Sequence, residues 1–174
     1  MKKFIIALVF AILPTVSFAQ QAFAKFEDVP EVLSVIVNKK MFELMSQVKL
    51  DPKDKEGQKY LALVKKLDNL KVFTTSSTKY SAEIKTAVTT YLKTNPLEEL
   101  MRINEGGQNI KIYVKNGATS TQVKELLMFM EGGKQETVLM SLTGNFDLSD
   151  ISILTDKMSL PGGNELKKAA TKKQ

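Results

Sequence analysis

The stretch from Gln108 to Phe146 constrains the fold more than any other part of this chain. It holds three runs with the residue pattern of β-strands, separated by short breaks at Asn116-Gly117 and at residues 131–134. The first run alternates apolar and polar residues, whereas the second is apolar at both parities, as expected of a strand covered on both faces. Connections this short favour antiparallel neighbours. The stretch therefore predicts an antiparallel meander at the centre of a single sheet.

Two more strands and five helical segments are expected around this meander. We predict a buried strand at 32–37, a strand at 70–75, helices after the caps Asn38, Asp51 and Ser77 or Thr78, a short helical segment at 96–103 and a last helix at 147–158. The helix after Asn38 has Met41, Leu44 and Val48 on its apolar side, and the helix after Ser77 or Thr78 has a buried stripe through Ile84, Val88 and Tyr91. This order predicts an α+β fold. We expect a single mixed, largely antiparallel five-stranded sheet with helices packed mainly on one face, as a two-layer sandwich.

The N-terminal segment has the pattern of an export signal. Two lysines precede an apolar run over residues 4–16, and the small residues Ser17 and Ala19 occupy the −3 and −1 positions. We expect cleavage after Ala19, which makes residues 1–19 a removed signal peptide. No later apolar run approaches the roughly 20 residues needed to span a bilayer. Because the chain contains no cysteine, we expect a protein without a lipid anchor in the periplasm or outer envelope of a Gram-negative bacterium.

Most of the net positive charge comes from the two ends of the chain. The sequence has 25 basic and 19 acidic residues, but lysines of the export signal and of residues 164–174 account for most of the excess. We expect residues 20–163 to form one nearly neutral domain and residues 164–174 to form a mobile basic tail. A basic face for nucleic acid is not indicated. The tail is either solvated or makes peripheral contact with an anionic membrane surface.

The residue types present exclude several chemistries. Without histidine or cysteine, the chain cannot use Ser-His-Asp or Cys-His catalysis, bind zinc through its usual ligands or carry out thiol redox reactions. The pairs Gly106-Gly107 and Gly132-Gly133 lack the strand-loop-helix spacing of a phosphate-binding loop. We therefore predict no cofactor.

Two acidic positions are candidates for chemistry. Asn145, Asp147 and Asp150 carry oxygen atoms that could bind a hard cation such as calcium, but Asp147 and Asp150 also suit the first turn of the last helix. We favour the capping role, because the calcium-loop spacing is absent. Glu125 interrupts an apolar strand. It is either a general acid with a shifted pKa or, as we favour, a glutamate with a structural partner.

Methionines form a second candidate metal site. Met41 and Met45 share a predicted helix face, and Met128 and Met130 share a predicted strand face. Thioethers can bind Cu(I), but methionine is also an ordinary filler of hydrophobic cores. We favour core packing and predict no metal site.

The second face of the predicted sheet is the candidate interaction surface. Aromatic, aliphatic and lysine side chains alternate there, namely Phe73, Lys111, Tyr113, Lys115 and Leu139, and Lys71 adds a further polar position to the same face. A mixed surface of this kind suits an envelope protein partner or a homodimer. The alternatives are a face covered by residues 20–30, which we call the lead-in segment, and a solvated face.

Three phrases, at residues 35–42, 124–127 and 139–148, resemble the exported family named domain of unknown function 4252 (DUF4252). The resemblance implies an exported envelope domain for which no activity is established, so it supplies no catalytic residues. Many relatives begin with a lipid-anchoring cysteine, which this chain lacks. We expect a non-catalytic interaction module; the alternatives are a carboxylate-dependent hydrolase using Glu125 or Asp147, and a metal-binding envelope protein.

Overall fold

The computed structural model describes residues 22–119, 121–132, 136–158, 161 and 166. The predicted signal peptide and its cleavage after Ala19 lie outside the described residues. The elements in chain order are η1 (Ala24–Phe26), β1 (Leu33–Asn38), α2 (Lys39–Met45), α3 (Lys55–Val64), β2 (Leu67–Thr75), α4 (Thr78–Thr94), β3 (Glu98–Glu105), β4 (Gln108–Asn116), β5 (Gln122–Gly132), β6 (Thr137–Asp147), η2 (Leu148–Asp150) and α5 (Ile151–Met158).

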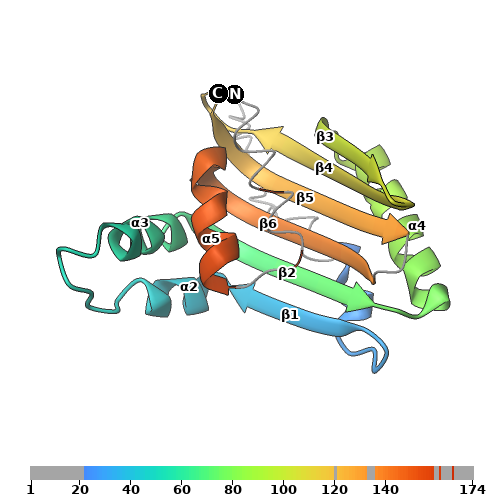
Figure 1. The fold of residues 1–174 in the computed structure, drawn as a ribbon, viewed down its shortest axis with the longest axis horizontal. Helices are drawn as coiled ribbons and strands as arrows, with labels where there is room; N and C mark the ends of the chain where they lie inside the picture. Colours follow the sequence, from blue (N-terminus) through green and yellow to red (C-terminus); the bar gives the residue numbers. More distant parts are fainter. Residues whose placement is uncertain (1–21, 120, 133–135, 159–160, 162–165, 167–174) are drawn as a thin grey trace, which may run out of the picture.

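The strands form one sheet in the order β1-β2-β6-β5-β4-β3, and each neighbouring pair is antiparallel (Figure 1). The α+β class and the predicted meander are therefore confirmed. Within the meander, Met128 of β5 lies between Ile112 of β4 and Met140 of β6. All three side chains are buried, as the doubly apolar pattern of β5 indicated.

The sheet has six strands, so the prediction of five was wrong. Residues 96–103 were expected to be helical, but Glu98–Glu105 is the strand β3, which pairs with β4. The register shifts between Glu99 and Met101. A bulge of this kind adds one residue to a strand, and both Leu100 and Met101 pack against the same core. Two adjacent apolar residues on one side imitate a helical stripe, which explains the error.

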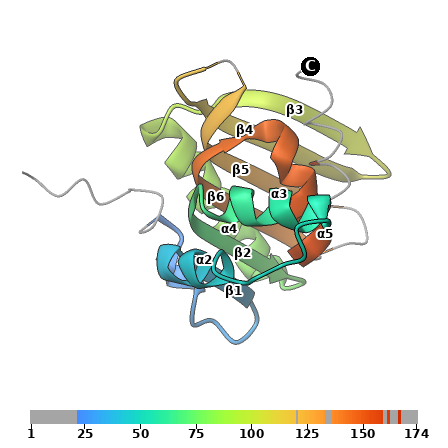
Figure 2. The ribbon, with the colours of Figure 1, turned by 90° about the vertical axis from the view of Figure 1, so that its left-hand side faces the viewer.

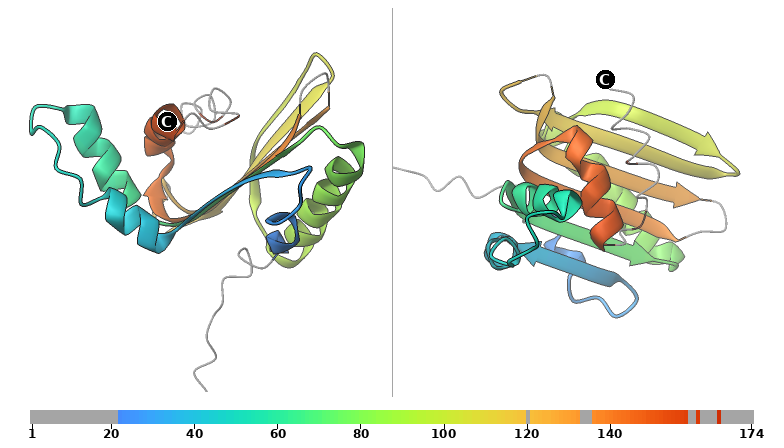
Figure 3. Two further views of the ribbon diagram at one scale, coloured as in Figure 1. Left: turned by 90° about the horizontal axis from the view of Figure 1, so that it is seen from below. Right: turned by 60° about the vertical axis from the view of Figure 1, so that its left-hand side comes forward.

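Two hydrophobic cores lie on opposite faces of the sheet. The first, which we call the large core, joins the sheet to α2, α3 and α5 through residues such as Phe42, Leu63 and Leu154. The second, the aromatic core, joins the sheet to η1 and α4 through Phe26 and Ile84. Figure 3 shows α4 on one side of the sheet and α3 and α5 on the other. The helices α2, α3 and α5 thus share one face, while η1 and α4 cover the other, so the arrangement has more layers than the expected two-layer sandwich.

In the sequence, polar residues on β2 suggested that the sheet face with the aromatic core is exposed to water. In the structure Lys71 is 5 % exposed and Thr75 is 2 % exposed. The Lys71 ammonium lies 2.7 Å from Glu27 Oε1, and the Thr75 hydroxyl donates to the Glu31 carbonyl at 2.7 Å. Buried polar groups need partners of this kind, and the lead-in segment supplies them.

Among the predicted helix caps, Asn38 is confirmed and Asp51 is corrected, while Ser77 precedes α4 without a capping hydrogen bond from its side chain. Asn38 accepts a hydrogen bond from the Met41 N–H at 3.0 Å, as a predicted N-cap should. The next helix is capped by Asp54, which accepts from the Gly57 N–H at 2.9 Å, and not by Asp51. Asp51 instead accepts from the Lys53 N–H in the preceding turn at 2.8 Å.

The C-terminal residues are described at two positions after α5. Leu166 falls within the segment predicted to be a mobile tail, yet it is 1 % exposed and belongs to the large core. Apart from Leu166, residues 164–174 lie outside the described part of the chain. No helix among the described residues is long and apolar enough to cross a membrane.

Candidate functional site

Within the part of the chain that the structure describes, large apolar side chains are left exposed in one short stretch only. Among the described residues, the large apolar side chains left exposed are Leu33 (68 %), Val35 (40 %), Ile36 (41 %), Met41 (51 %), Leu44 (51 %) and Val48 (54 %). All of them lie between Leu33 and Val48, and we call this set the β1–α2 surface. Several exposed large apolar side chains within one stretch of the chain mark a candidate interaction site more strongly than a scattered leucine does.

The β1 part of this surface is an unprotected sheet edge. β1 is the terminal strand, and β2 is its pairing partner among the described residues, in a register without shifts (Figures 1 and 2). Its six residues, Leu33–Asn38, include no charge and no proline. Edge strands are usually blunted by charges, prolines or bulges. The opposite edge, β3, has both charges and a register shift.

The α2 part of the surface follows directly from β1. Asn38 ends the strand and caps the helix, so the two elements are continuous. Phe42 is 1 % exposed and anchors α2 in the large core. Met41 and Leu44, on other sides of this short helix, are consequently left in solvent.

A cavity of about 310 Å³ adjoins the end of this surface. Its lining is mainly apolar and consists of Met45, Val48, Leu50, Asp54, Gly57, Tyr60, Leu61 and Lys157. The Asp54 carboxylate already caps α3, and burial raises the pKa of Tyr60 above its ordinary value. The cavity therefore offers an apolar recess beside Val48.

The β1–α2 surface was not predicted from the sequence. Residues 32–37 were expected to be a buried strand, and Met41, Leu44 and Val48 were expected on the buried side of a helix. A strand that is apolar at both parities reads the same whether it is central or at an edge, because edge position depends on topology. The one local signal was the crowding of apolar residues into a helix of Lys39–Met45, too short to bury them all.

The predicted interaction face does not exist as one exposed surface. Phe73 and Leu139 are both 0 % exposed and belong to the aromatic core under η1 and α4. The Phe73 ring meets the Phe26 ring edge-on, with 5.9 Å between centroids. On β4, Lys111 and Tyr113 are half-buried and Lys115 is exposed. The lead-in segment and α4 therefore cover Phe73 and Leu139, whereas the three β4 residues of the predicted face keep some exposure to solvent.

Glu125 has a structural partner in the aromatic core. Its Oε1 accepts a hydrogen bond from the Tyr91 hydroxyl at 2.6 Å, and the pair is buried. Burial raises the pKa of Glu125, while the Tyr91 hydrogen bond and the Lys115 charge offset part of that shift. Burial, together with this carboxylate, also raises the pKa of Tyr91 well above its usual range. A cavity of about 410 Å³ over α4 is lined by Tyr91 but not by Glu125.

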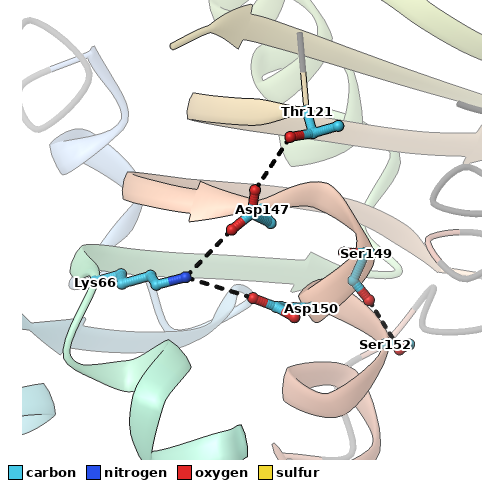
Figure 4. A network of polar contacts seen from close by, with 6 residues as sticks. All are labelled: Lys66, Thr121, Asp147, Ser149, Asp150 and Ser152. Carbon is cyan, nitrogen blue, oxygen red and sulfur yellow. Dashed lines mark hydrogen bonds and ion pairs between the residues drawn. The ribbon is translucent and has the colours of Figure 1, made fainter. Parts of the chain in front are cut away.

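A lysine pairs with both aspartates of the acidic cluster that was weighed as a calcium site and as a helix cap. The Lys66 ammonium lies 3.2 Å from Asp147 Oδ2 and 3.7 Å from Asp150 Oδ2 (Figure 4). The Thr121 hydroxyl donates to Asp147 Oδ1 at 3.3 Å. Asp147 precedes η2 without a capping hydrogen bond from its side chain, so its predicted capping role was wrong. These carboxylates instead connect β6 and η2 to the residue that precedes β2.

The methionines do not converge. Met128 and Met130 are buried in the large core, Met45 packs partly against it, and Met41 is exposed on α2. Within the described part of the chain, no group of three or more His, Cys, Asp or Glu side chains is arranged to hold a metal ion.

A family model described as "Domain of unknown function (DUF4252)" matches residues 26–154, from η1 into α5. No curated protein matches the chain, and no solved structure matches it.

Proposed function

The chain belongs to the family described as domain of unknown function DUF4252, and we propose that it is a non-catalytic interaction module that binds a protein partner through the β1–α2 surface. This proposal is carried by one observation: among the residues with a described placement, the large exposed apolar side chains all lie within Leu33–Val48. Keeping apolar area in water costs roughly 25 cal/mol per Å². A surface that retains such area in one place gains most from a partner that covers it.

The partner that fits this surface presents apolar side chains. Met41 and Leu44 offer adaptable contact area, and the recess beside Val48 has room for one large anchoring side chain. The charges nearby are largely matched within the chain. Lys39 lies 3.0 Å from Asp68, and Lys40 lies 3.5 Å from Glu43. Apolar contact, with a rim of paired charges, therefore dominates the proposed recognition.

We place the module in the cell envelope because residues 1–19 have the pattern of an export signal. In this proposal the protein acts in the periplasm or at the outer envelope. Glu125 and Asp147, the carboxylates that a hydrolase would need, have structural roles here, since Tyr91 and Lys66 already engage them.

Replacing Met41 and Leu44 together with serine tests the proposal. Both side chains are 51 % exposed, so the expected cost in stability is small. If each contributes as a typical interface anchor, about 1–2 kcal/mol, affinity for the envelope partner should fall at least tenfold. The measurement is a quantitative pull-down from native envelopes, followed by titration of the recovered partner against both proteins.

The matched control replaces Thr86 and Thr89 of α4 with serine, because both residues are exposed and far along the chain from the surface. The control should bind as the unmodified protein does. Equal binding by the Met41→Ser, Leu44→Ser variant, with its fold intact by circular dichroism, would eliminate the β1–α2 surface as the binding site.

A further inference from the structure

We propose that the outer edge of β1 pairs with β1 of a second copy of this chain, antiparallel about a two-fold axis beside Val35. The two sheets would then join into one continuous sheet. This inference rests on the proposed function in using part of the same surface, and it assigns an occupant to the β1 part. Free backbone groups along an edge strand make such pairing available.

The apolar residues of β1 favour pairing centred on Val35. In an antiparallel pair related by a two-fold axis, the residue at the axis faces its own copy. Centring on Val35 sets Leu33 of one copy opposite Val37 of the other. Val35 is the register partner of Val72 in β2, so these side chains lie on the large-core side of the sheet. Pairing would cover Leu33 and Val35, which are 68 % and 40 % exposed.

Charges flanking β1 favour the same register. Glu31 and Lys39 are both exposed, and centring on Val35 brings Glu31 of one copy to the level of Lys39 of the other. Lys39 also lies 3.0 Å from Asp68 of its own copy, so it would bridge two carboxylates. Centring on Ile36 would instead set Leu33 opposite Lys39. Opposite-charge pairs across strands stabilise a register. Leu33 opposite Lys39 supplies no such pair, so the register centred on Val35 is favoured.

The other edge of the sheet explains why assembly would stop at two copies. β3 begins with Glu98 and Glu99, carries Arg102 and contains a register shift. Charges and bulges discourage strand pairing. Heterologous β1-to-β3 contact, which would propagate into a filament, is therefore disfavoured relative to the closed pair.

Cysteine cross-linking in the mature chain, residues 20–174, tests this register. Because the chain contains no cysteine, each variant has a single thiol. Facing residues in an antiparallel pair bring their Cβ atoms within about 4.5–5.5 Å, close to disulfide range. Under mild oxidation, Val35→Cys should give at least tenfold more covalent dimer than Ile36→Cys or the exposed control Thr86→Cys. A mixture of Ser34→Cys and Ile36→Cys proteins should cross-link to each other.

Sedimentation and charge reversal complete the test. The unmodified chain should sediment as a dimer, and Val35→Lys, which puts like charges at the axis, should shift it to a monomer. Glu31→Lys and Lys39→Glu should each weaken the dimer at least tenfold, and the double reversal should restore most of it. A monomer across a wide dilution series, or equal cross-linking at Val35 and Thr86, would overturn the inference.

The outcomes separate this inference from the proposed function. If the chain is monomeric but Met41→Ser, Leu44→Ser still loses its partner, self-pairing is wrong and the interaction module stands. If the chain is a dimer but that variant keeps its partner, self-pairing through β1 stands and the proposed interaction module is wrong.

Discussion

Replacing Phe73 with alanine is expected to lower the free energy of unfolding by about 3–5 kcal/mol, the usual cost of removing a fully buried aromatic ring. Phe73 is 0 % exposed, and its ring packs edge-on against Phe26 of the lead-in segment. In the same core lie Leu127, Leu139 and Ile84 of α4. Loss of this ring would weaken the attachment of both η1 and α4 to the sheet.

Urea denaturation followed by circular dichroism measures this change. The control is Leu44→Ala, which removes an apolar side chain of similar class that is 51 % exposed. It should cost at most about 1 kcal/mol, because much of that side chain is already in water. A Phe73→Ala protein as stable as Leu44→Ala would mean that Phe73 lies on an open face and that the aromatic core is misplaced.

Replacing Gly144 with alanine should lower the free energy of unfolding by several kcal/mol. Losses of this size are typical of substitutions that create a steric clash in a packed structure. A Cβ at Gly144 would lie 2.3 Å from the Lys66 carbonyl oxygen and 2.9 Å from Leu67 Cα. Both atoms belong to backbone, which cannot swing aside. The neighbouring Asn145 N–H donates to the same Lys66 carbonyl at 2.8 Å, so relief of the clash would break that hydrogen bond.

Gly106→Ala is the matched control for this position. Gly106 has φ +59, and an added Cβ would meet nothing within 4 Å. Gly106→Ala should lower the free energy of unfolding by about 1–2 kcal/mol, because only the left-handed backbone conformation disfavours alanine there. Thermal unfolding of both variants gives the comparison. Equal shifts in Tm would show that β2 and β6 do not approach each other as closely as the structure describes.

Local patterns predicted much of the fold. The meander of β4, β5 and β6, the cap at Asn38 and the buried stripe of α4 through Ile84, Val88 and Tyr91 all depend on residues close in sequence. For such features the periodicity of apolar residues and the chemistry of caps are sufficient.

Features set by distant contacts could not be predicted in this way. Lys71 suggested a wet sheet face, because its partner Glu27 lies 44 positions earlier in the chain. β3 imitated a helix because of its bulge. The β1–α2 surface could not be predicted for the same reason. An apolar strand and a short apolar helix have the pattern of buried elements, and only the strand order shows that β1 lies at the edge of the sheet.

The most direct test of the central claim is the accessibility of Leu44→Cys in its native setting. Because the chain contains no cysteine, a thiol-specific reagent will report on that position alone, and Thr86→Cys on α4 serves as the exposed reference. If the β1–α2 surface binds a partner, Leu44→Cys will label at least tenfold more slowly in intact envelopes than in purified protein, while Thr86→Cys labels equally in both. Equal rates for Leu44→Cys in the two settings would contradict a bound partner at this surface.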